Sequence, residues 1–386
     1  MIRSTVARVN LAAVQANFRA LQQFLQASPP RGGAAPAIIA VVKANAYGHG
    51  AERVALALEQ AGARMLACAD IEEGIVLRRA GITVPILVFG ALSVSELGGL
   101  FECSLTPTIS TPSAARAVQS AAARRGIRVG YHLKIDTGMN RLGFRHDNLR
   151  RTLPELLASP NLQLDAVYTH FATADVPGHP LFEDQRRRFE EAMTTVDGLA
   201  AAAARGTTPR VLYHASNSAA LLRDSRVWYD IVRPGILLYG IVPPPLASTL
   251  PLEPVLSLTS RVVAVKGLRP GEGVGYGSRF TAGTPMTIAV VPAGYADGLD
   301  LRLEQRGHVL VRGRRVPIIG AVSMDMLTID VTGLPDVEPG DEVVLIGRQG
   351  DESWQHIDVR EMAAAIGTIP YEIVCRIGAR IERQYS

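Results

Sequence analysis

The chain has 386 residues, of which 47% are hydrophobic and 20% charged, a composition typical of globular proteins. This length exceeds one ordinary core, so we expect two domains, one of which can be a large α/β barrel. A net charge of +4 is compatible with a nucleic-acid partner, but no aromatic residues are interleaved with a basic cluster, so we set nucleic acid aside.

The N-terminus and the cysteines indicate a cytoplasmic protein. Polar residues interrupt the first 21 positions, which therefore lack the continuous apolar core of a secretion signal. No apolar run reaches the length of a membrane span, so we expect no membrane partner. Cys68, Cys103 and Cys375 are odd in number and in no metal-ligand spacing, which favours a reducing compartment and no metal site.

Short apolar runs alternate with helical patterns between residues 37 and 240. Helical spacing covers 51–61, 112–125 and the Ala-rich 182–205, where Arg186 to Arg188 lie among acidic residues and indicate a solvated helix face. The alternation predicts a parallel sheet, and eight units in about 240 residues match a (β/α)8 TIM-type barrel. An open doubly wound sheet is the alternative. The apolar runs cover residues 37–42, 65–69, 85–90, 105–110, 129–135, 162–170, 210–216 and 230–240.

The residue pattern of the sequence changes after the proline-rich stretch at residues 237–248. Val- and Ile-rich runs separated by Gly and Pro continue to about residue 350, a pattern typical of a mainly β domain. We therefore expect a boundary near residue 245, with a barrel over 1–245 and a mainly β domain over 246–386.

Lys43 directly follows the apolar run at 37–42. An ammonium in apolar surroundings is disfavoured unless it is paired, neutral or covalently used. A polar residue at the end of a single strand has an ordinary structural explanation. However, the active sites of barrels gather at the carboxyl ends of the strands. Other polar residues lie at the ends of predicted strands in the same way, namely Lys134, Asp136, His170, His214 and Arg233.

The sequence resembles the alanine racemases, pyridoxal-phosphate enzymes with an N-terminal barrel and a C-terminal β domain. The resemblance spans residues 7 to about 377 and implies a homodimer in which each site is completed by the β domain of the partner. It implies interconversion of L- and D-alanine, which supplies D-alanine for peptidoglycan. The motifs that carry it are AVVKANAYGHG, KIDTGMNRLG, YTHFA, NSAA, RPGILLYG, GVGYGSRF, GYADG, SMDM and PYEIVC.

The resemblance also assigns the cofactor-binding residues. Lys43 would form a Schiff base with the aldehyde of pyridoxal 5′-phosphate, so it would not be an orphan ammonium. Arg233 would face the pyridine nitrogen and restrain full delocalisation of the carbanion, because a guanidinium keeps its proton. Asn217 and Ser218 begin a helix whose N-terminus favours an anion. The implied cofactor-binding set is Lys43, Tyr47, His170, Asn217, Ser218, Arg233, Gly235, Ile236 and Tyr371, of which Tyr47, Ser218, Gly235 and Tyr371 would hold the phosphate.

Racemisation requires proton removal from one face of the α-carbon and delivery to the other. The resemblance assigns these roles to Lys43 and to Tyr276 of the partner subunit, with His170 linking Tyr276 to Arg233 and lowering its phenol pKa. The resemblance also implies that Arg141 and the Met324 amide bind the substrate carboxylate. A carbamylated Lys134 would orient Arg141, and Tyr295 and Asp325 would be supporting residues.

Three positions depart from the family pattern. Ala321 replaces an arginine of the entrance channel in many relatives, Ser323 replaces a cysteine seen in some, and Asn140 lies at a variable position. Serine or a larger amino acid is therefore an alternative substrate. A barrel-type decarboxylase is a further alternative, but it places an acid where Arg233 lies. A non-catalytic pyridoxal-phosphate carrier protein would lack the β domain.

Overall fold

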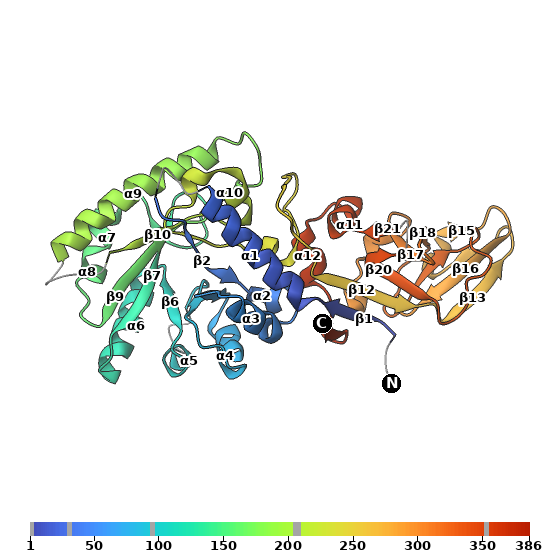
Figure 1. Ribbon diagram of the computed structural model, residues 1–386, viewed down its shortest axis with the longest axis horizontal. Helices are drawn as coiled ribbons and strands as arrows, with labels where there is room; N and C mark the ends of the chain where they lie inside the picture. Colours follow the sequence, from blue (N-terminus) through green and yellow to red (C-terminus); the bar gives the residue numbers. More distant parts are fainter. Residues whose placement is uncertain (1–3, 29–32, 93–96, 204–209, 351–354) are drawn as a thin grey trace.

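The computed structural model has two parts, an α/β barrel (left in Figure 1) and a mainly β part (right). Helix α1 (Leu11–Ala27) runs along the barrel towards the β part. None of the described helices is both long and apolar enough to cross a membrane. The structure describes residues 4–28, 33–92, 97–203, 210–350 and 355–386.

The parallel sheet of the barrel closes on itself through residues 37–42. The Ile39 amide donates to Val232 O on one neighbouring strand (2.9 Å), and the Ala40 amide donates to Met65 O on the other (3.0 Å). The predicted barrel is therefore confirmed, and the open doubly wound sheet is wrong. In the order of their pairing the strands are β2 (Ala37–Ile38), β11 (Ile231–Val232), β10 (Leu212–His214), β9 (Leu162–Tyr168), β7 (Val129–Asp136), β6 (Thr106–Ile109), β5 (Ile86–Val88), β4 (Leu66–Cys68) and β3 (Ala40–Val41), with β8 (Phe144–Arg145) beside β7.

One predicted strand is much shorter than expected. The run at 230–240 contains only the two residues of β11, and Ile236–Tyr239 form the 3-10 helix η3. Pro234 explains the break, because its nitrogen cannot donate to a sheet. Single backbone bonds to the neighbouring segments continue at Arg233 and Pro234, and the chain then turns into η3.

The predicted helices form and cover the outside of the barrel. Thr111 caps α6 (Pro112–Arg125) by accepting from the Ala114 amide (3.2 Å), and Gly126 ends it in the left-handed conformation (φ +65°). In α9 (Leu181–Ala203) Arg186 pairs with Glu183, as expected of a solvated face. Residues 204–205 of the predicted helix lie outside the described residues. The remaining helices of the barrel are α2 (Lys43–Tyr47), α3 (Ala51–Gln60), α4 (Ile71–Arg79), α5 (Gly98–Glu102), α7 (Leu149–Thr152), α8 (Pro154–Leu157) and α10 (Ser218–Arg223).

The second part is mainly β, as predicted, and it also includes a strand from the start of the chain. β1 (Val6–Val9) pairs antiparallel with β12 (Leu256–Arg261) and parallel with β22 (Glu382–Tyr385), so these residues of the expected 1–245 barrel lie in the other sheet. This part also contains two helices: α12 (Pro370–Cys375) packs against α2 of the barrel, and α11 (Val359–Ile366) packs against α12. The other strands are β13 (Ala264–Leu268), β14 (Gly273–Val274), β15 (Phe280–Thr281), β16 (Met286–Val291), β17 (His308–Val311), β18 (Arg314–Ile319), β19 (Leu327–Asp330), β20 (Glu342–Gln349) and β21 (Gln355–Ile357).

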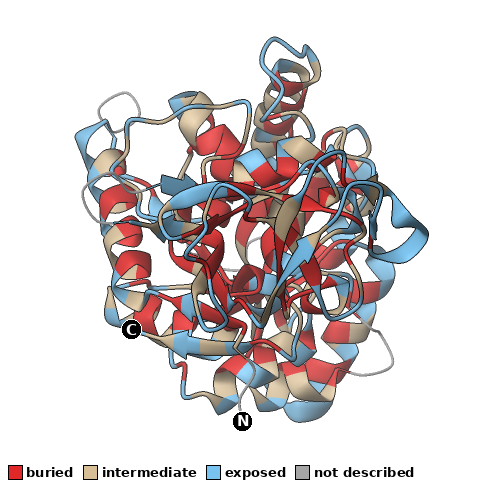
Figure 2. Cartoon of the chain, turned by 90° about the vertical axis from the view of Figure 1, so that its right-hand side faces the viewer, coloured by how far each residue is buried: buried red, intermediate tan, exposed pale blue. Residues whose placement is uncertain are grey.

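A buried polar contact fixes the connection between the two parts. Asn17, fully buried on α1, donates to Leu238 O (3.1 Å) and Glu253 O (2.8 Å) and accepts from the Glu253 amide (2.7 Å). These bonds satisfy the buried amide and hold the segment after η3 against α1. One cluster of buried hydrophobic residues extends through both parts, and in Figure 2 exposed loops surround the buried segments. The barrel and the β part therefore share one apolar core.

Candidate active site

A cavity of about 490 Å³ opens at the carboxyl ends of the barrel strands. Two of the three lysines of the chain, Lys43 and Lys134, line it. Most of the lining comes from different strand ends, as the barrel predicts, while Tyr371 reaches it from α12 of the β part. The predicted residues brought together here are Lys43, Tyr47, Lys134, Arg141, His170, Asn217, Ser218, Arg233, Gly235 and Tyr371.

Lys43 begins a left-handed turn that leads its side chain into this cavity. Residues 44–47 all have φ between +52° and +54°, although none is glycine. Each costs about 1–2 kcal/mol relative to a right-handed conformation, so contacts from outside must hold the turn. Val42 before it is buried, whereas the Lys43 side chain is open to the cavity. Partial withdrawal from water, followed by the charge of Arg141, lowers the pKa of Lys43.

His49 closes the other end of the turn. Its Nδ1 lies 3.0 Å from Ala46 O and 2.9 Å from Tyr47 O, so the proton on Nδ1 is donated to the turn. Burial lowers the pKa of His49 to about 4, which leaves the ring neutral at pH 7. The ring packs on Tyr239 (4.5 Å between centroids), whose hydroxyl donates to Val41 O. His49 therefore ties the turn to the strand that precedes it.

Arg233 lies at the centre of a buried hydrogen-bond network. It donates to His214 Nδ1 (2.8 Å) and to the carbonyls of Thr169 (2.9 Å) and Ala215 (3.0 Å). His214 Nε2 lies 3.0 Å from His132 Nδ1. Burial lowers the pKa of Arg233 to about 10, so the guanidinium keeps its charge at neutral pH. The network therefore presents a fixed cation to the cavity.

Lys134 and Arg233 lie over the same aromatic ring. Lys134 Nζ is 4.5 Å from the centroid of Tyr168, and the Arg233 guanidinium carbon is 5.1 Å from it. Burial, and then the charges of Arg233 and Arg141, lower the pKa of Lys134 well below its ordinary value. His170 Nδ1 lies 3.5 Å from Arg233 Nη2, which places it beside the guanidinium as expected. Lys134 is therefore a buried amine that favours the neutral form.

Another group of cavity residues offers donors suited to an anion. The Gly235 amide donates to Ser218 Oγ (2.9 Å), and Asn217 caps α10 through the Ala220 amide (2.9 Å). A Cβ on Gly235 would lie 2.2 Å from Tyr47 Oη, so only glycine fits this close approach. Burial raises the pKa of both Tyr47 and Tyr371, which keeps their hydroxyls as donors. Next to Gly235, Ile236 is fully buried.

Besides the buried Ile236, four predicted residues do not line this cavity in their own chain. Tyr276 lies on the 3-10 helix η4 (Tyr276–Ser278) of the β part with 78% of its surface exposed. Met324 and Tyr295 are also exposed, and Asp325 pairs with Arg380 (2.8 Å). Their roles therefore remain predictions that depend on a partner subunit.

The sequence analysis missed three residues that contact this site. His132 and Tyr168 were not selected, and Glu73 binds the Ala44 amide through Oε1 (2.6 Å). His132 carried a usable signal, because it lies two residues before Lys134 on β7 and therefore points to the same face of the strand. Glu73 carried no such signal, because nothing in its helical sequence indicates contact with a turn 29 residues earlier.

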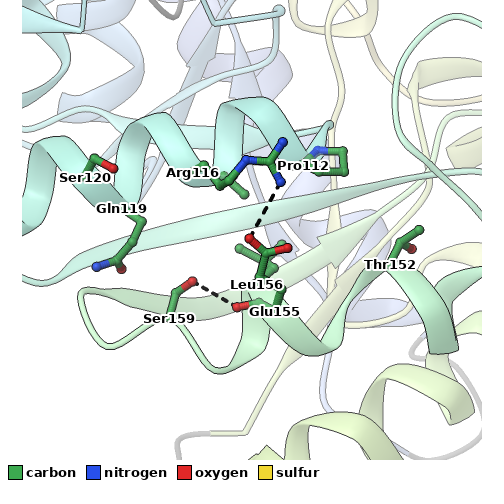
Figure 3. Close-up of a pocket in the computed structure, with 9 residues that line it drawn as sticks. Pro112, Arg116, Gln119, Ser120, Thr152, Glu155, Leu156 and Ser159 are labelled. Atoms are coloured by element: carbon green, nitrogen blue, oxygen red, sulfur yellow. Dashed lines mark hydrogen bonds and ion pairs between the residues drawn. The ribbon is translucent and has the colours of Figure 1, made fainter.

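A second cavity lies outside the barrel, between α6 and the segment around α8 (Figure 3). Its volume is about 160 Å³, and Arg116 forms an ion pair with Glu155 beside it (3.6 Å). It contains no residue of the predicted site. The chemistry-bearing residues therefore gather in the cavity at the strand ends.

A β/α barrel with a lysine at the end of its first strand, followed by a β domain, defines the class of barrel-type amino-acid racemases and decarboxylases. Two family models match the chain: Alanine racemase, N-terminal domain, over residues 9–243, and Alanine racemase, C-terminal domain, over residues 255–385. The chain therefore belongs to the alanine racemase family.

Similar proteins cover the whole chain. The alanine racemase of Symbiobacterium thermophilum is 42% identical over 386 residues, which is all of this chain and 98% of that protein. The crystal structure of alanine racemase from D-cycloserine-producing Streptomyces lavendulae matches all of this chain and 98% of its own, with a TM-score of 0.89 and 34% identity. That of Bacillus anthracis with bound L-Ala-P has a TM-score of 0.86 and 37% identity, covering 100% and 96% of the two chains.

Proposed function

We propose that this chain is a pyridoxal-phosphate-dependent racemase that interconverts L- and D-alanine. Its family is named for this activity and uses pyridoxal phosphate. The observation that carries the proposal is the position of Lys43, which opens into the same strand-end cavity as a charged Arg233. A reactive amine and a fixed cation in one cavity are the groups that this cofactor requires.

The residues of the cavity fit this cofactor. Lys43 would hold its aldehyde covalently, and Arg233 would donate a hydrogen bond to its ring nitrogen. The close approach of Gly235 to Tyr47, together with the hydroxyls of Ser218 and Tyr371, suits the phosphate. Ile236, Asn217 and His170 complete the proposed set. When bound, pyridoxal phosphate withdraws electrons from the α-carbon of an attached amino acid and so acidifies its hydrogen.

Arg233 would limit that withdrawal of electrons. A guanidinium does not transfer its proton at neutral pH, so it offers a hydrogen bond and leaves the ring nitrogen unprotonated. His214 and two carbonyls hold it in this orientation. Weak electron withdrawal by the cofactor ring favours return of the proton to the α-carbon over side reactions. This property distinguishes the proposed racemase from the decarboxylase alternative.

Two bases on opposite faces of the α-carbon would move the proton. Lys43, whose pKa is lowered by its surroundings, would serve one face. The partner subunit's Tyr276 would serve the other, and the exposure of Tyr276 in its own chain agrees with that role. The active unit is therefore a homodimer with shared sites, in which His170 would connect Tyr276 to Arg233.

The remaining polar groups would bind and orient the substrate. Arg141 and the Met324 amide of the partner would grip the carboxylate. A plain ammonium at Lys134 would repel Arg141, whereas its neutral amine can combine with carbon dioxide, lose a proton and become a carbamate that attracts it. Tyr295 and Asp325 would support the Met324 loop.

The racemase would supply D-alanine for bacterial peptidoglycan. A cytoplasmic location, expected from the cysteine content, stays a prediction. Serine is the second substrate to consider, because the small residues Ala321 and Ser323 lie on the β part, where the entrance is expected. Turnover of serine would widen the substrate range of the proposed racemase, but the reaction would still be racemisation.

A chiral assay tests the proposal directly. Purified protein with pyridoxal phosphate is incubated separately with L-alanine, D-alanine and L-serine, and both enantiomers and carbon dioxide are measured. We expect each alanine enantiomer to reach an equal mixture. Carbon dioxide release without the opposite enantiomer would establish the decarboxylase instead, and no reaction with a bound cofactor would indicate a carrier protein.

A further inference from the structure

Both oxygens of the Glu73 carboxylate bind backbone amides at the ends of neighbouring barrel strands. Oε1 accepts from the Ala44 amide (2.6 Å), and Oε2 accepts from the Ala69 amide (2.7 Å). Ala44 follows Lys43 and is the first residue of the left-handed turn, while Ala69 directly follows β4. An ionised carboxylate that accepts two amide protons forms strong, short bonds. Glu73 therefore links the two strand ends.

Glu73 can hold both amides in place because its own helix, α4, is fixed at both ends. Asp70 caps α4 and accepts from the Glu73 amide (2.8 Å). At the other end of α4, Arg78 donates to Cys103 O (2.9 Å) and to Val84 O (2.9 Å). A side chain on an element held at both ends defines the position of its partner better than a loop residue does.

The turn needs such a contact at its start. Four consecutive non-glycine residues in the left-handed conformation are unfavourable, and His49 holds only the last two through their carbonyls. Glu73 holds the first amide. Without that bond, the turn would retain the bonds from the Ala46 amide to Val42 O, from the Gly48 amide to Ala44 O and from the Gly50 amide to Asn45 O, but none of these three bonds involves the Ala44 amide.

We propose that Glu73 is a positioning residue for Lys43, which fixes the peptide that follows Lys43 and thereby directs the amine into the cavity. Its negative charge also favours the ammonium form of Lys43, against the opposing charges of Arg141 and Arg233. Glu73 acts through the backbone and the local field, so it need not touch the substrate. The inference rests on the proposed role of Lys43.

Glu73→Gln tests the proposal, with Glu72→Gln as the matched control. The variant keeps the size of the side chain but loses the charge and one of the two acceptors, while Glu72 is an exposed neighbour on the same helix turn. In cofactor-free protein, amide hydrogen exchange of the segment 43–50 should become about tenfold faster in Glu73→Gln and stay unchanged in Glu72→Gln. In the loaded enzyme, kcat should fall about tenfold with an unchanged KM for alanine.

Two outcomes would overturn the proposed role of Glu73. Unchanged exchange in the 43–50 segment would overturn the proposal whatever the activity, and so would a lower melting temperature with normal kcat and KM, which marks a purely structural role. If Glu73→Gln does not fold, Glu73→Asp keeps the charge but is too short to reach both amides, and the same exchange and kcat losses are expected. If the wild-type protein fails to racemise alanine, the proposed function falls, while the exchange experiment still decides whether Glu73 holds the turn.

Discussion

Arg233 and His214 form a buried pair in which the guanidinium donates to Nδ1 of the imidazole over 2.8 Å. Because an arginine can only donate, Nδ1 must be unprotonated, and the single proton of His214 lies on Nε2. That proton is then donated to His132 Nδ1, 3.0 Å away. The cation of Arg233 therefore fixes the tautomers of both histidines, and burial, together with this charge, lowers the pKa of each ring.

Neutral buried histidines predict that stability falls in mild acid. The pKa of His132 is lowered to about 3 and that of His49 to about 4, mainly by burial, and those of His214 and His170 lie well below 6.5. Between these values and about 6.5 the unfolded chain binds more protons than the folded one, so the free energy of unfolding decreases as the pH falls through this window. Each histidine contributes about 1.4 kcal/mol per pH unit.

Urea unfolding between pH 6 and pH 5 checks this prediction. His132→Gln should reduce the pH slope of the unfolding free energy by about 1.4 kcal/mol per pH unit. His308→Gln, on β17 outside the cluster, is the control substitution. Equal slopes in the wild-type protein and His132→Gln would mean that His132 is not held neutral.

Lys43→Ala should abolish racemisation and leave the fold intact. Loss of a general base typically lowers a rate by about 10² to 10⁴-fold, and this lysine would also hold the cofactor. Its side chain opens into the cavity, so we expect a change in unfolding free energy within about 0.5 kcal/mol. The measurements are a chiral assay, cofactor absorbance and urea unfolding. Lys266→Ala, an exposed lysine on β13, is the control. Retention of most activity by Lys43→Ala would refute the role assigned to the lysine.

The proposed sharing of each active site between two subunits predicts complementation between two inactive variants. Lys43→Ala and Tyr276→Phe homodimers each lack one base, but a mixed dimer contains one site with both. An equal mixture that exchanges subunits freely should recover about a quarter of the wild-type activity, since half of the dimers are mixed and half of their sites are intact. Native mass spectrometry establishes the exchange, and each variant incubated alone is the control. Mixed dimers without activity would place both bases in one chain.

The two bases should make separable contributions to proton exchange. The family resemblance assigns the α-proton of D-alanine to Lys43 and that of L-alanine to Tyr276. In Tyr276→Phe, exchange of the α-hydrogen of L-alanine with deuterated solvent should fall about 10² to 10⁴-fold, while exchange of D-alanine stays measurable. Net racemisation must fall equally in both directions, because the equilibrium constant between enantiomers is one. Equal exchange losses for both enantiomers would favour a single base.

The sequence by itself determined the barrel and most of its site. Alternating apolar runs and helical patterns predict a parallel sheet, and in a closed parallel barrel all strands end on one rim. Lys43, Lys134, His170 and Arg233 therefore had to meet once each was placed at a strand end. The β part could likewise be predicted from the spacing of its Gly and Pro residues. The alternation of strands and helices and the spacing of turns are both local periodic patterns, which a sequence shows directly.

Only the tertiary structure decided how those groups are held. Nothing in the sequence of residues 44–47 indicates a left-handed turn, since only Asn45 tolerates that conformation readily; distant contacts from Glu73 and His49 impose it. The pairing of Arg233 with His214 joins two strand ends, and the placement of β1 beside β22 joins the two ends of the chain. Such contacts depend on where the closed core brings segments together, and local preferences of about 1 kcal/mol per residue are too weak to specify them.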